Sequence, residues 1–378
     1  MPDDPTAQPA LDTQAAVAAH AVTARFGHRL LGLPLTHLAR VADPPQHRVV
    51  GPWNYWWQAH YLDAIVDAGL RALRQGDDES AQRRAARGDR LLATIRLRNV
   101  GRFTNLYYDD MAWLALAVGR LSLLHEALGR ARPRRRLRVA EVALTRQLRS
   151  AITTDLGGGA FWNTTRDFKN VPATAPVALH LARQGRSTEA AGLVDWLYAR
   201  LLGERGLFLD GIRVTSGVEH VVPDIWSYNQ GTVLGALITL GDAGSLCRAA
   251  DLVHEIATQL TGPDAGRLVL RTHGGGDGGL FTGILVRYLA LAAGETRLAV
   301  ETRQLATAMV TQTADALWAG RSEHPLGGDG PVVFPVHPVD PVDPDDPVTG
   351  WPAEPGDGVV ELSTQLQAWM TFEAAAAL

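Results

Sequence analysis

The feature that most constrains the fold of this 378-residue chain is an apolar repeat at positions i, i+3 and i+4 that runs through almost every long segment. This repeat is typical of amphipathic helices, and the strict alternation expected of strands is scarce. It predicts an all-α chain. The twelve predicted helices lie near residues 11–31, 54–75, 79–98, 108–129, 135–151, 170–184, 187–203, 227–241, 244–261, 279–293, 296–318 and 361–377.

The segments between these helices differ in length and composition. Short polar spacers, such as 75–78 and 241–244, suit tight helix hairpins. Other spacers are long and rich in glycine, aromatic and polar residues; they lie at 41–53, 100–107, 155–170, 207–226, 262–278 and 320–360. Long loops at every second junction predict an (α/α)6 barrel of six helix hairpins, with the long loops gathered at one end.

The domain organisation follows from the same pattern. We expect a flexible N-terminal segment over 1–12 and a single domain over 13–378. Residues 339–347 are rich in Pro and Asp and cannot form a regular helix. A domain linker and a calcium loop are the alternatives for 320–360, but only about one helix follows it and its aspartate spacing matches no EF-hand. We therefore expect 320–360 to be a surface loop at the rim of a cleft that the long loops form at one end of the barrel.

Composition narrows the class of function. A net charge of −4 argues against a general nucleic-acid binder or a binder of anionic membranes. No apolar run approaches the roughly 18 residues of a membrane span and no signal peptide is evident, so we expect a cytoplasmic protein. Cys247 is the only cysteine, which excludes an internal disulfide, and its helix predicts a buried position. The twelve histidines are scattered and no phosphate-binding loop is complete, so neither a metal nor another cofactor is expected.

The strongest functional signal is the acidic pair Asp109 and Asp110, which is flanked by Tyr107, Tyr108 and Trp113. Two explanations remain open from the residues alone. The pair could cap the start of a helix, where carboxylates meet free N–H groups and the positive end of the helix dipole. Alternatively, it could supply the two carboxyl groups of a glycosidase, because repulsion between neighbours raises one pKa and keeps that group protonated.

Four further clusters of aromatic and amide residues lie at the long-loop junctions, within 53–58, 157–170, 210–231 and 273–283. Flat rings and amide or hydroxyl partners are the usual means of holding a sugar. Any single cluster could equally be a core aromatic with helix caps. Their predicted position at one end of the barrel favours a sugar-binding cleft.

Taken in order, six motifs resemble the family-76 glycoside hydrolases, the endo-α-1,6-mannanases. They lie at 108–113, 158–163, 169–170, 228–231, 281–288 and 361–365, and the resemblance runs from about Trp53 to the C-terminus. It implies an (α/α)6 barrel and retaining cleavage of α-1,6-mannosidic bonds without a metal. It also implies that Asp109 is the nucleophile and Asp110 the general acid/base. Lys169, the only lysine of the chain, falls in one of the matched motifs.

The clusters and the resemblance together give fourteen candidate substrate-binding residues. They are Trp56, Trp57, Gln58, Tyr108, Trp113, Trp162, Asn163, Lys169, Asn170, Asp210, Tyr228, Asn229, Gln230 and Phe281. The expected partner is a mannan-type glycan, with no nucleic acid, and the chain is expected to be a monomer. The alternatives are another α/α-barrel sugar enzyme, such as an epimerase or an unsaturated-uronide hydrolase, and a non-catalytic glycan-binding protein.

Overall fold

The computed structural model describes residues 7–45, 51–130, 134–262, 266–322, 331–338 and 358–378. Twelve α-helices account for most of this part of the chain, in the predicted number and order. They are α1 (Ala7–Phe26), α2 (Tyr55–Arg74), α3 (Asp78–Arg98), α4 (Tyr108–Ala127), α5 (Arg135–Ala151), α6 (Val171–Arg183), α7 (Ser187–Arg200), α8 (Ser227–Leu240), α9 (Ala243–Gln259), α10 (Phe281–Gly294), α11 (Val300–Ala319) and α12 (Leu362–Ala375).

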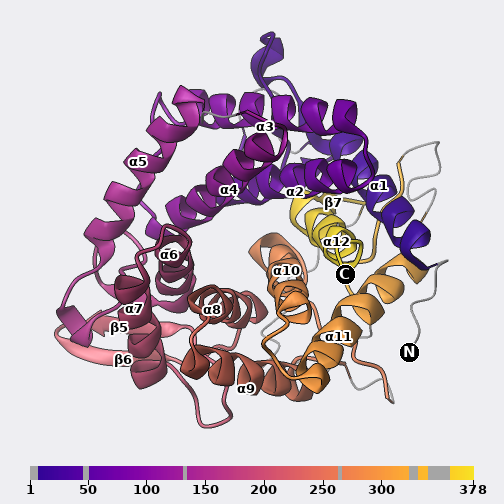
Figure 1. The fold of residues 1–378 in the computed structure, drawn as a ribbon. Coiled ribbons are helices and arrows are strands. Elements are labelled where there is room, and N and C mark those ends of the chain that lie inside the picture. The colour runs from indigo at the N-terminus through magenta and orange to yellow at the C-terminus, as the bar shows by residue number, and fades with distance from the viewer. Residues whose placement is uncertain (1–6, 46–50, 131–133, 263–265, 323–330, 339–357) are drawn as a thin grey trace.

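The even-numbered helices form an inner ring, in which each packs against the next and α12 packs against α2 (Figure 1). The odd-numbered helices form an outer layer around them. The predicted (α/α)6 barrel is therefore confirmed, with one difference. Five of its pairs are hairpins of consecutive helices, whereas the sixth combines α12 with α1 from the other end of the chain.

The two rings differ in sequence as their surroundings require. Inner helix α8 contains no charged residue and is buried along nearly its whole length. Outer helix α5 buries one stripe, which includes Leu137, Ala140, Leu144 and Leu148, and carries arginines elsewhere. A helix packed on both sides needs apolar residues all round, and a helix facing water needs only one apolar face.

Glycines let the inner helices approach closely. A Cβ added at Gly231 of α8 would lie 2.7 Å from the Cα of Leu285 in α10. A Cβ at Gly283 of α10 would lie 2.8 Å from the Cα of Gln367 in α12. These contacts are too short for any side chain, so both positions require glycine unless the helices separate.

Several inner helices begin with the same clamp, in which the fourth residue of the helix binds a loop through backbone atoms. In α2 the side-chain oxygen of Gln58 accepts from the N–H of Ala39 at 2.9 Å, and its amide nitrogen donates to the carbonyl of Ala39 at 3.0 Å. Gln230 of α8 binds Phe208 in this way, and Gln365 of α12 binds Phe334. We call these three the glutamine clamps.

Short strands occur between the helices, which the helical pattern did not predict. They are β1 (Gly27–His28), β2 (Leu38–Ala39), β3 (Ala42–Asp43), β4 (Phe168–Asn170), β5 (Gly211–Thr215), β6 (Val218–Val222) and β7 (Val360–Glu361). Strands β5 and β6 form a hairpin that pairs with β4. Its two-residue turn, Ser216 and Gly217, has φ values of 53° and 79°, as a type I′ turn requires.

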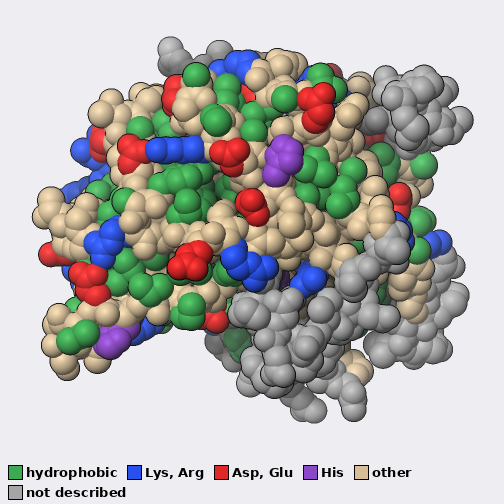
Figure 2. All heavy atoms as spheres, turned by 90° about the horizontal axis from the view of Figure 1, so that it is seen from below, with side chains coloured by type: hydrophobic (Ala, Val, Ile, Leu, Met, Phe, Trp, Pro, Cys, Tyr) green, Lys and Arg blue, Asp and Glu red, His purple; other side chains and the backbone are tan. Residues whose placement is uncertain are grey.

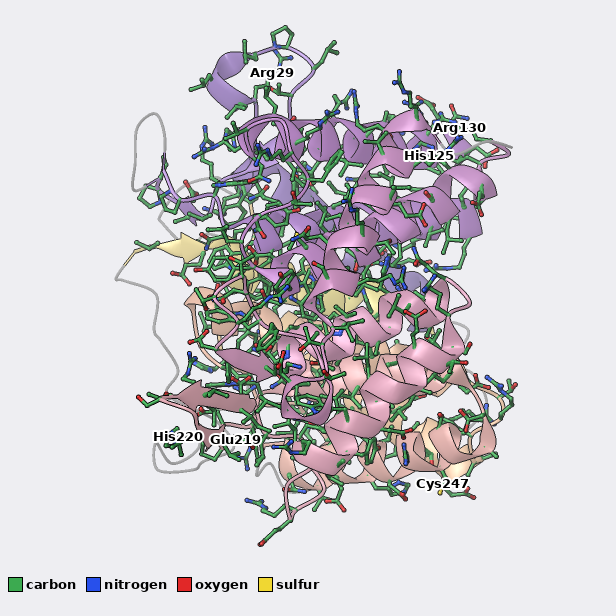
Figure 3. All side chains as sticks on the ribbon, turned by 90° about the vertical axis from the view of Figure 1, so that its left-hand side faces the viewer. Arg29, His125, Arg130, Glu219, His220 and Cys247 are labelled. Atoms are coloured by element: carbon green, nitrogen blue, oxygen red, sulfur yellow. The ribbon has the colours of Figure 1, made fainter. Side chains whose placement is uncertain are left out.

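The two ends of the barrel differ in character (Figure 3). The hairpin with Glu219 and His220 lies at the end that carries the strands and long loops. His125, in the last turn of inner helix α4, and Arg130, shortly after that helix, lie at the other end. The inner helices therefore begin at the loop end and finish at the opposite end.

Three local predictions need comment. Helix α1 begins at Ala7, so residues 7–12 of the segment expected to be flexible are helical, and residues 1–6 lie outside the described part. The same helix ends at Phe26 instead of about residue 31, because the chain turns there into β1 and Leu31 has a φ of 48°. Residues 339–347 lie outside the described part.

The surface carries mixed charge, with acidic and basic side chains interspersed on the face seen in Figure 2. Cys247 is exposed on α9 (Figure 3), which corrects the prediction that it is buried, because it falls on the polar face of an amphipathic helix. Among the described residues, no helix combines the length and the hydropathy needed to cross a membrane.

Candidate active site

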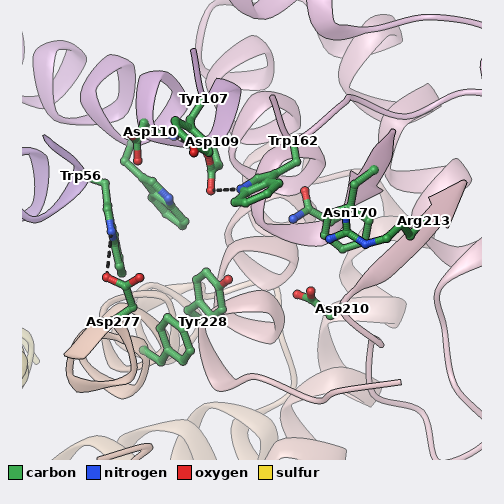
Figure 4. Close-up of a pocket in the computed structure, with 13 residues that line it drawn as sticks. Trp56, Tyr107, Asp109, Asp110, Trp162, Asn170, Asp210, Arg213, Tyr228 and Asp277 are labelled. Carbon is green, nitrogen blue, oxygen red and sulfur yellow. Dashed lines mark hydrogen bonds between the residues drawn. The ribbon is translucent and has the colours of Figure 1, made fainter. Parts of the chain in front are cut away.

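A cavity of about 490 Å³ opens at the loop end of the barrel (Figure 4). This volume lies within the usual range of small-molecule sites. Inner helices contribute at their N-terminal ends, and the loops before them complete the wall. The lining residues are Trp56, Tyr107, Asp109, Asp110, Trp113, Trp162, Phe168, Asn170, Asp210, Arg213, Tyr228, Asp277 and Phe281.

Asp109 and Asp110 occupy the first turn of α4. The start of this helix is tied to a neighbouring loop, because the N–H of Tyr108 donates to the carbonyl of Trp162 at 2.7 Å. Carboxylates are favoured in a first turn by the helix dipole. The two explanations of the sequence pattern thus coincide, since the pair starts a helix and also faces the cavity.

Asp109 accepts two N–H hydrogen bonds. The indole of Trp162 donates to its Oδ2 at 2.8 Å, and the backbone N–H of Asp110 donates to its Oδ1 at 2.8 Å. Burial, followed by the charge of Asp110, raises the pKa of Asp109 well above its ordinary value, and the two donors oppose this rise. Donors of this kind stabilise the ionised form of a carboxyl group.

Asp110 has a different environment. The side-chain amide of Asn105 donates to its Oδ2 at 2.6 Å. Burial raises the pKa of Asp110 to about 7; the bond from Asn105 lowers it and the charge of Asp277 raises it. Because the charge of Asp110 raises the pKa of Asp109, the two carboxyl groups interact and titrate as a pair.

Asp277 lies on the opposite wall of the cavity (Figure 4), and two indoles donate to it. Its Oδ1 accepts from Trp57 at 2.9 Å and from Trp56 at 3.2 Å. It belongs to the short helix η3 (Gly276–Leu280), whose first N–H donates to Glu361 at 2.5 Å. The glycine-rich run around it matches no phosphate-binding loop, so no sequence motif singled out Asp277.

Aromatic rings form much of the remaining wall. Tyr228 and Phe281 are stacked, with centroids 3.9 Å apart and an interplanar angle of 8°. Trp113 lies against Tyr228 at 6.2 Å, and Tyr107 meets Trp162 edge-on at 5.2 Å. Such surfaces suit the apolar faces of sugar rings.

A second polar group lies beside the strands. Asp210 accepts from the amide of Asn229 at 3.2 Å, and burial raises the pKa of Asp210 to about 6. Arg213 of β5 stacks over the ring of Phe168 at 4.3 Å. The cavity therefore offers acceptors, donors and one guanidinium to sugar hydroxyl groups.

The structure brings nine of the predicted site residues to the cavity and places the other seven elsewhere. The nine are Asp109, Asp110, Trp56, Trp113, Trp162, Asn170, Asp210, Tyr228 and Phe281. The seven that do not line the cavity are Trp57, Gln58, Tyr108, Asn163, Lys169, Asn229 and Gln230.

Most of these seven support the cavity wall from behind. Gln58 and Gln230 are fully buried and form glutamine clamps, so their amides are already occupied. Trp57 and Asn229 are buried and donate to cavity residues. Tyr108 is buried in the first turn of α4.

The remaining two stabilise loops. Asn163 accepts from the backbone N–H of Thr165 at 3.0 Å. Lys169 is fully buried, and its ammonium group donates to oxygens of the loop 153–159. Burial lowers the pKa of Lys169 to about 8.

Sequence reasoning did not select Tyr107, Phe168, Arg213 and Asp277 for the cavity, or Asn105 as the partner of Asp110. All five lie in or next to long loops that the sequence had identified. The sequence therefore indicated which loops form the site, but it could not show which residues of each loop face the cavity. Among the described residues, no three His, Cys, Asp or Glu side chains are grouped as a metal ion would require.

Comparison with solved structures gives close matches over the whole fold. The GH76A α-1,6-mannanase from Salegentibacter sp. HEL1_6 is 26% identical with a TM-score of 0.76, and the match covers 97% of this chain and 99% of that one. An inactive variant of that enzyme with two aspartates replaced, solved with α-1,6-mannotetrose, matches equally well, at 26% identity and a TM-score of 0.76 over 97% of this chain and 98% of that one. A family 76 mannosidase from Bacteroides thetaiotaomicron VPI-5482 shares the fold, with a TM-score of 0.72 at 16% identity over 97% and 98% of the two chains.

No curated protein matches the chain. The model of glycosyl hydrolase family 76 matches residues 39–329, which is most of the chain. This match agrees with the barrel, with the paired carboxyl groups at its loop end and with the solved relatives. The chain belongs to glycosyl hydrolase family 76 and is a glycoside hydrolase.

Proposed function

We propose that this enzyme hydrolyses α-1,6-mannosidic linkages with retention of configuration, using Asp109 as nucleophile and Asp110 as general acid/base. The observation that carries the proposal is the pair of adjacent carboxyl groups in one cavity with unequal hydrogen-bond environments. Retaining glycosidases need one ionised and one protonated carboxyl group near the same glycosidic bond.

The hydrogen bonds support this division of roles. Asp109 accepts from the Trp162 indole and from a backbone N–H, which favours its carboxylate. Burial raises the pKa of both groups, that of Asp110 to about 7, so the pair retains a proton near neutral pH. We assign this proton to Asp110, because it accepts one N–H bond where Asp109 accepts two. One group is thus suited to attack and the other to protonation.

The reaction has two steps. Asp109 attacks the anomeric carbon while Asp110 gives its proton to the leaving glycosidic oxygen, which yields a glycosyl ester and a free sugar hydroxyl. Asp110, now ionised, then takes a proton from water, which attacks the same carbon and releases Asp109 as carboxylate. Two inversions give net retention.

The substrate is assigned by similarity and by the chemistry of the wall. The Salegentibacter relative is named as an α-1,6-mannanase and was solved with α-1,6-linked mannooligosaccharides. In this chain, Tyr228, Phe281 and Trp113 offer ring faces, and Asp210 and Arg213 offer groups for hydroxyls.

The test is incubation with linear α-1,6-mannan and α-1,6-mannotetraose, with the first product followed by proton NMR. The α-anomer is expected to appear first, and initial release of the β-anomer would contradict retention. No cleavage of either substrate would contradict the proposed linkage. Asp109→Asn should lower kcat by about 10³-fold or more, as removal of a nucleophile does in other hydrolases.

A matched control and a rescue experiment complete the test. Asp195→Asn makes the same chemical change at an exposed ion pair with Arg248 and should leave kcat unchanged. With an activated aryl α-mannoside, azide should rescue Asp109→Ala as the β-mannosyl azide and Asp110→Ala as the α-mannosyl azide. The reverse assignment of products would exchange the two roles.

A further inference from the structure

A second cavity, of about 270 Å³, lies at the end of the barrel opposite the active site. It is formed toward the C-terminal ends of the inner helices α4, α6, α10 and α12, together with α2. One side is apolar and includes Leu291, Met370 and Ala374. The other side carries charged groups, among them three arginines, Arg120, Arg183 and Arg287, and two acidic residues.

Two of these arginines are neutralised by a closed ring of ion pairs. Arg120 donates one guanidinium nitrogen to Asp63 and another to Asp67. Arg287 does the same, at 2.5 Å to each aspartate. All four carboxylate oxygens of Asp63 and Asp67 accept within this ring, so it leaves no acceptor unused on either aspartate.

Glu373, the other acidic residue that lines the cavity, is also engaged. Glu373 accepts from Arg71 at 2.9 Å and 3.1 Å, through both of its oxygens, and from the indole of Trp369 at 2.9 Å. Its side chain is almost completely buried. Breaking such a pair would strand a buried charge, so Glu373 cannot turn toward another cation.

This leaves Arg183 without an acidic partner in the described part of the chain. It is the last residue of α6, it is exposed to solvent and lines the cavity, and its side chain makes no hydrogen bond or ion pair with the described residues. Arg71, Arg120, Arg183 and Arg287 supply four positive charges, against three negative charges from Asp63, Asp67 and Glu373. The single uncompensated charge of this group lies on Arg183.

We propose that this second cavity binds a small oxyanion, a phosphate or a carboxylate, through the guanidinium of Arg183. A guanidinium presents a planar pair of donors that matches both kinds of oxyanion. The cavity volume limits the ligand to a small molecule, and the apolar side accommodates a short carbon chain next to the anionic group. The competing explanation is a solvated arginine that only complements the C-terminal end of the helix dipole.

The experiment compares inorganic phosphate, acetate and chloride at equal ionic strength, by calorimetry and by thermal unfolding of the full chain. Wild-type protein is expected to bind phosphate or acetate at one site and to gain thermal stability as the anion is added. Binding of phosphate alone would assign a phosphate ligand, and binding of acetate alone a carboxylate ligand. If neither anion binds more tightly than chloride, the proposal is overturned.

Variants locate the site. Arg183→Gln should weaken binding at least tenfold while leaving the unfolding temperature without anion unchanged, because the guanidinium has no partner to lose among the described residues. Arg183→Lys keeps the charge but not the paired donors and should give an intermediate affinity. Arg146→Gln makes the same change on the exposed face of α5 and should bind as wild type. Equal binding by Arg183→Gln and wild type would place the anion elsewhere and refute the proposal.

Discussion

Lys169→Met tests whether the only lysine of the chain stabilises the active-site loop from behind. Its ammonium nitrogen lies 2.6 Å from the carbonyl oxygens of Asp155 and Gly158 and 2.9 Å from the hydroxyl of Thr153. Two further oxygens, of Thr153 and Gly159, lie at 3.2 Å and 3.3 Å. Methionine fills a similar volume but offers no donor, so the substitution removes the hydrogen bonds and leaves the packing.

The expected cost follows from the number of bonds. An ammonium group has three N–H donors, and each net hydrogen bond contributes about 1 kcal/mol, with more for charged donors. Desolvation of the charge opposes this gain, so we take about 3 kcal/mol in total. In a chain of this size 1 kcal/mol changes the melting temperature by about 1–2 °C, so we expect a decrease of about 3–6 °C.

Activity should fall as well. The loop bound by Lys169 leads directly to Trp162, whose indole N–H donates to Asp109. Looser placement of this donor should lower kcat more than it raises KM.

The measurement is thermal and denaturant unfolding, combined with steady-state kinetics on α-1,6-mannooligosaccharides. Arg146→Met is the matched control, since it removes one positive charge from an exposed helix face. If Lys169→Met and Arg146→Met unfold at the same denaturant concentration, the ammonium group does not stabilise the loop and the reasoning fails.

Three other predictions concern the carboxyl pair and the helix packing. Asp277→Asn removes a negative charge that raises the pKa of Asp110, so the alkaline limb of the kcat/KM profile should move to lower pH by about 1 unit. Asn105→Ala removes a hydrogen bond that lowers the same pKa, so it should move this limb to higher pH by about 1 unit. Shifts in the same direction would contradict the electrostatic explanation. Asp110→Asn should unfold at a higher temperature than wild type at about pH 8. A carboxyl group with a raised folded pKa stabilises the protein below its unfolded pKa, and this effect is lost as the pH rises through about 7. Equal melting temperatures at about pH 8 would refute the prediction. Gly231→Ala should destabilise the protein by about 1–3 kcal/mol, because its Cβ would lie 2.7 Å from Leu285, and an unchanged melting temperature would disprove this contact.

The helices were predictable because apolar periodicity is a local property. The inner and outer rings follow from it too, since α8 lacks charged residues and α5 carries them on one face. The partner of α1 could not be read from the sequence, because its contact with α12 joins segments at opposite ends of the chain. The strands β5 and β6 were missed because they lie in a loop chosen for its chemistry, although Ser216 and Gly217 are a turn signal.

The site was predictable in part for a similar reason. Adjacent carboxyl groups among aromatic residues are visible in one dimension, and both Asp109 and Asp110 face the cavity. Whether a polar side chain near a cleft faces the substrate or the backbone behind it depends on the path of another loop. Lys169 and Gln58 were assigned to the substrate for lack of this information, and Asp277 was overlooked.

The glutamine clamps have a consequence for how such an enzyme can change. Gln58 grips its loop through the backbone N–H and carbonyl of Ala39, and Gln230 binds those of Phe208 in the same manner. Every amino acid except proline offers these two groups. Mutations can therefore replace the side chains of the gripped segments, and with them the preference for one glycan over another, while the attachment point of each segment stays in place.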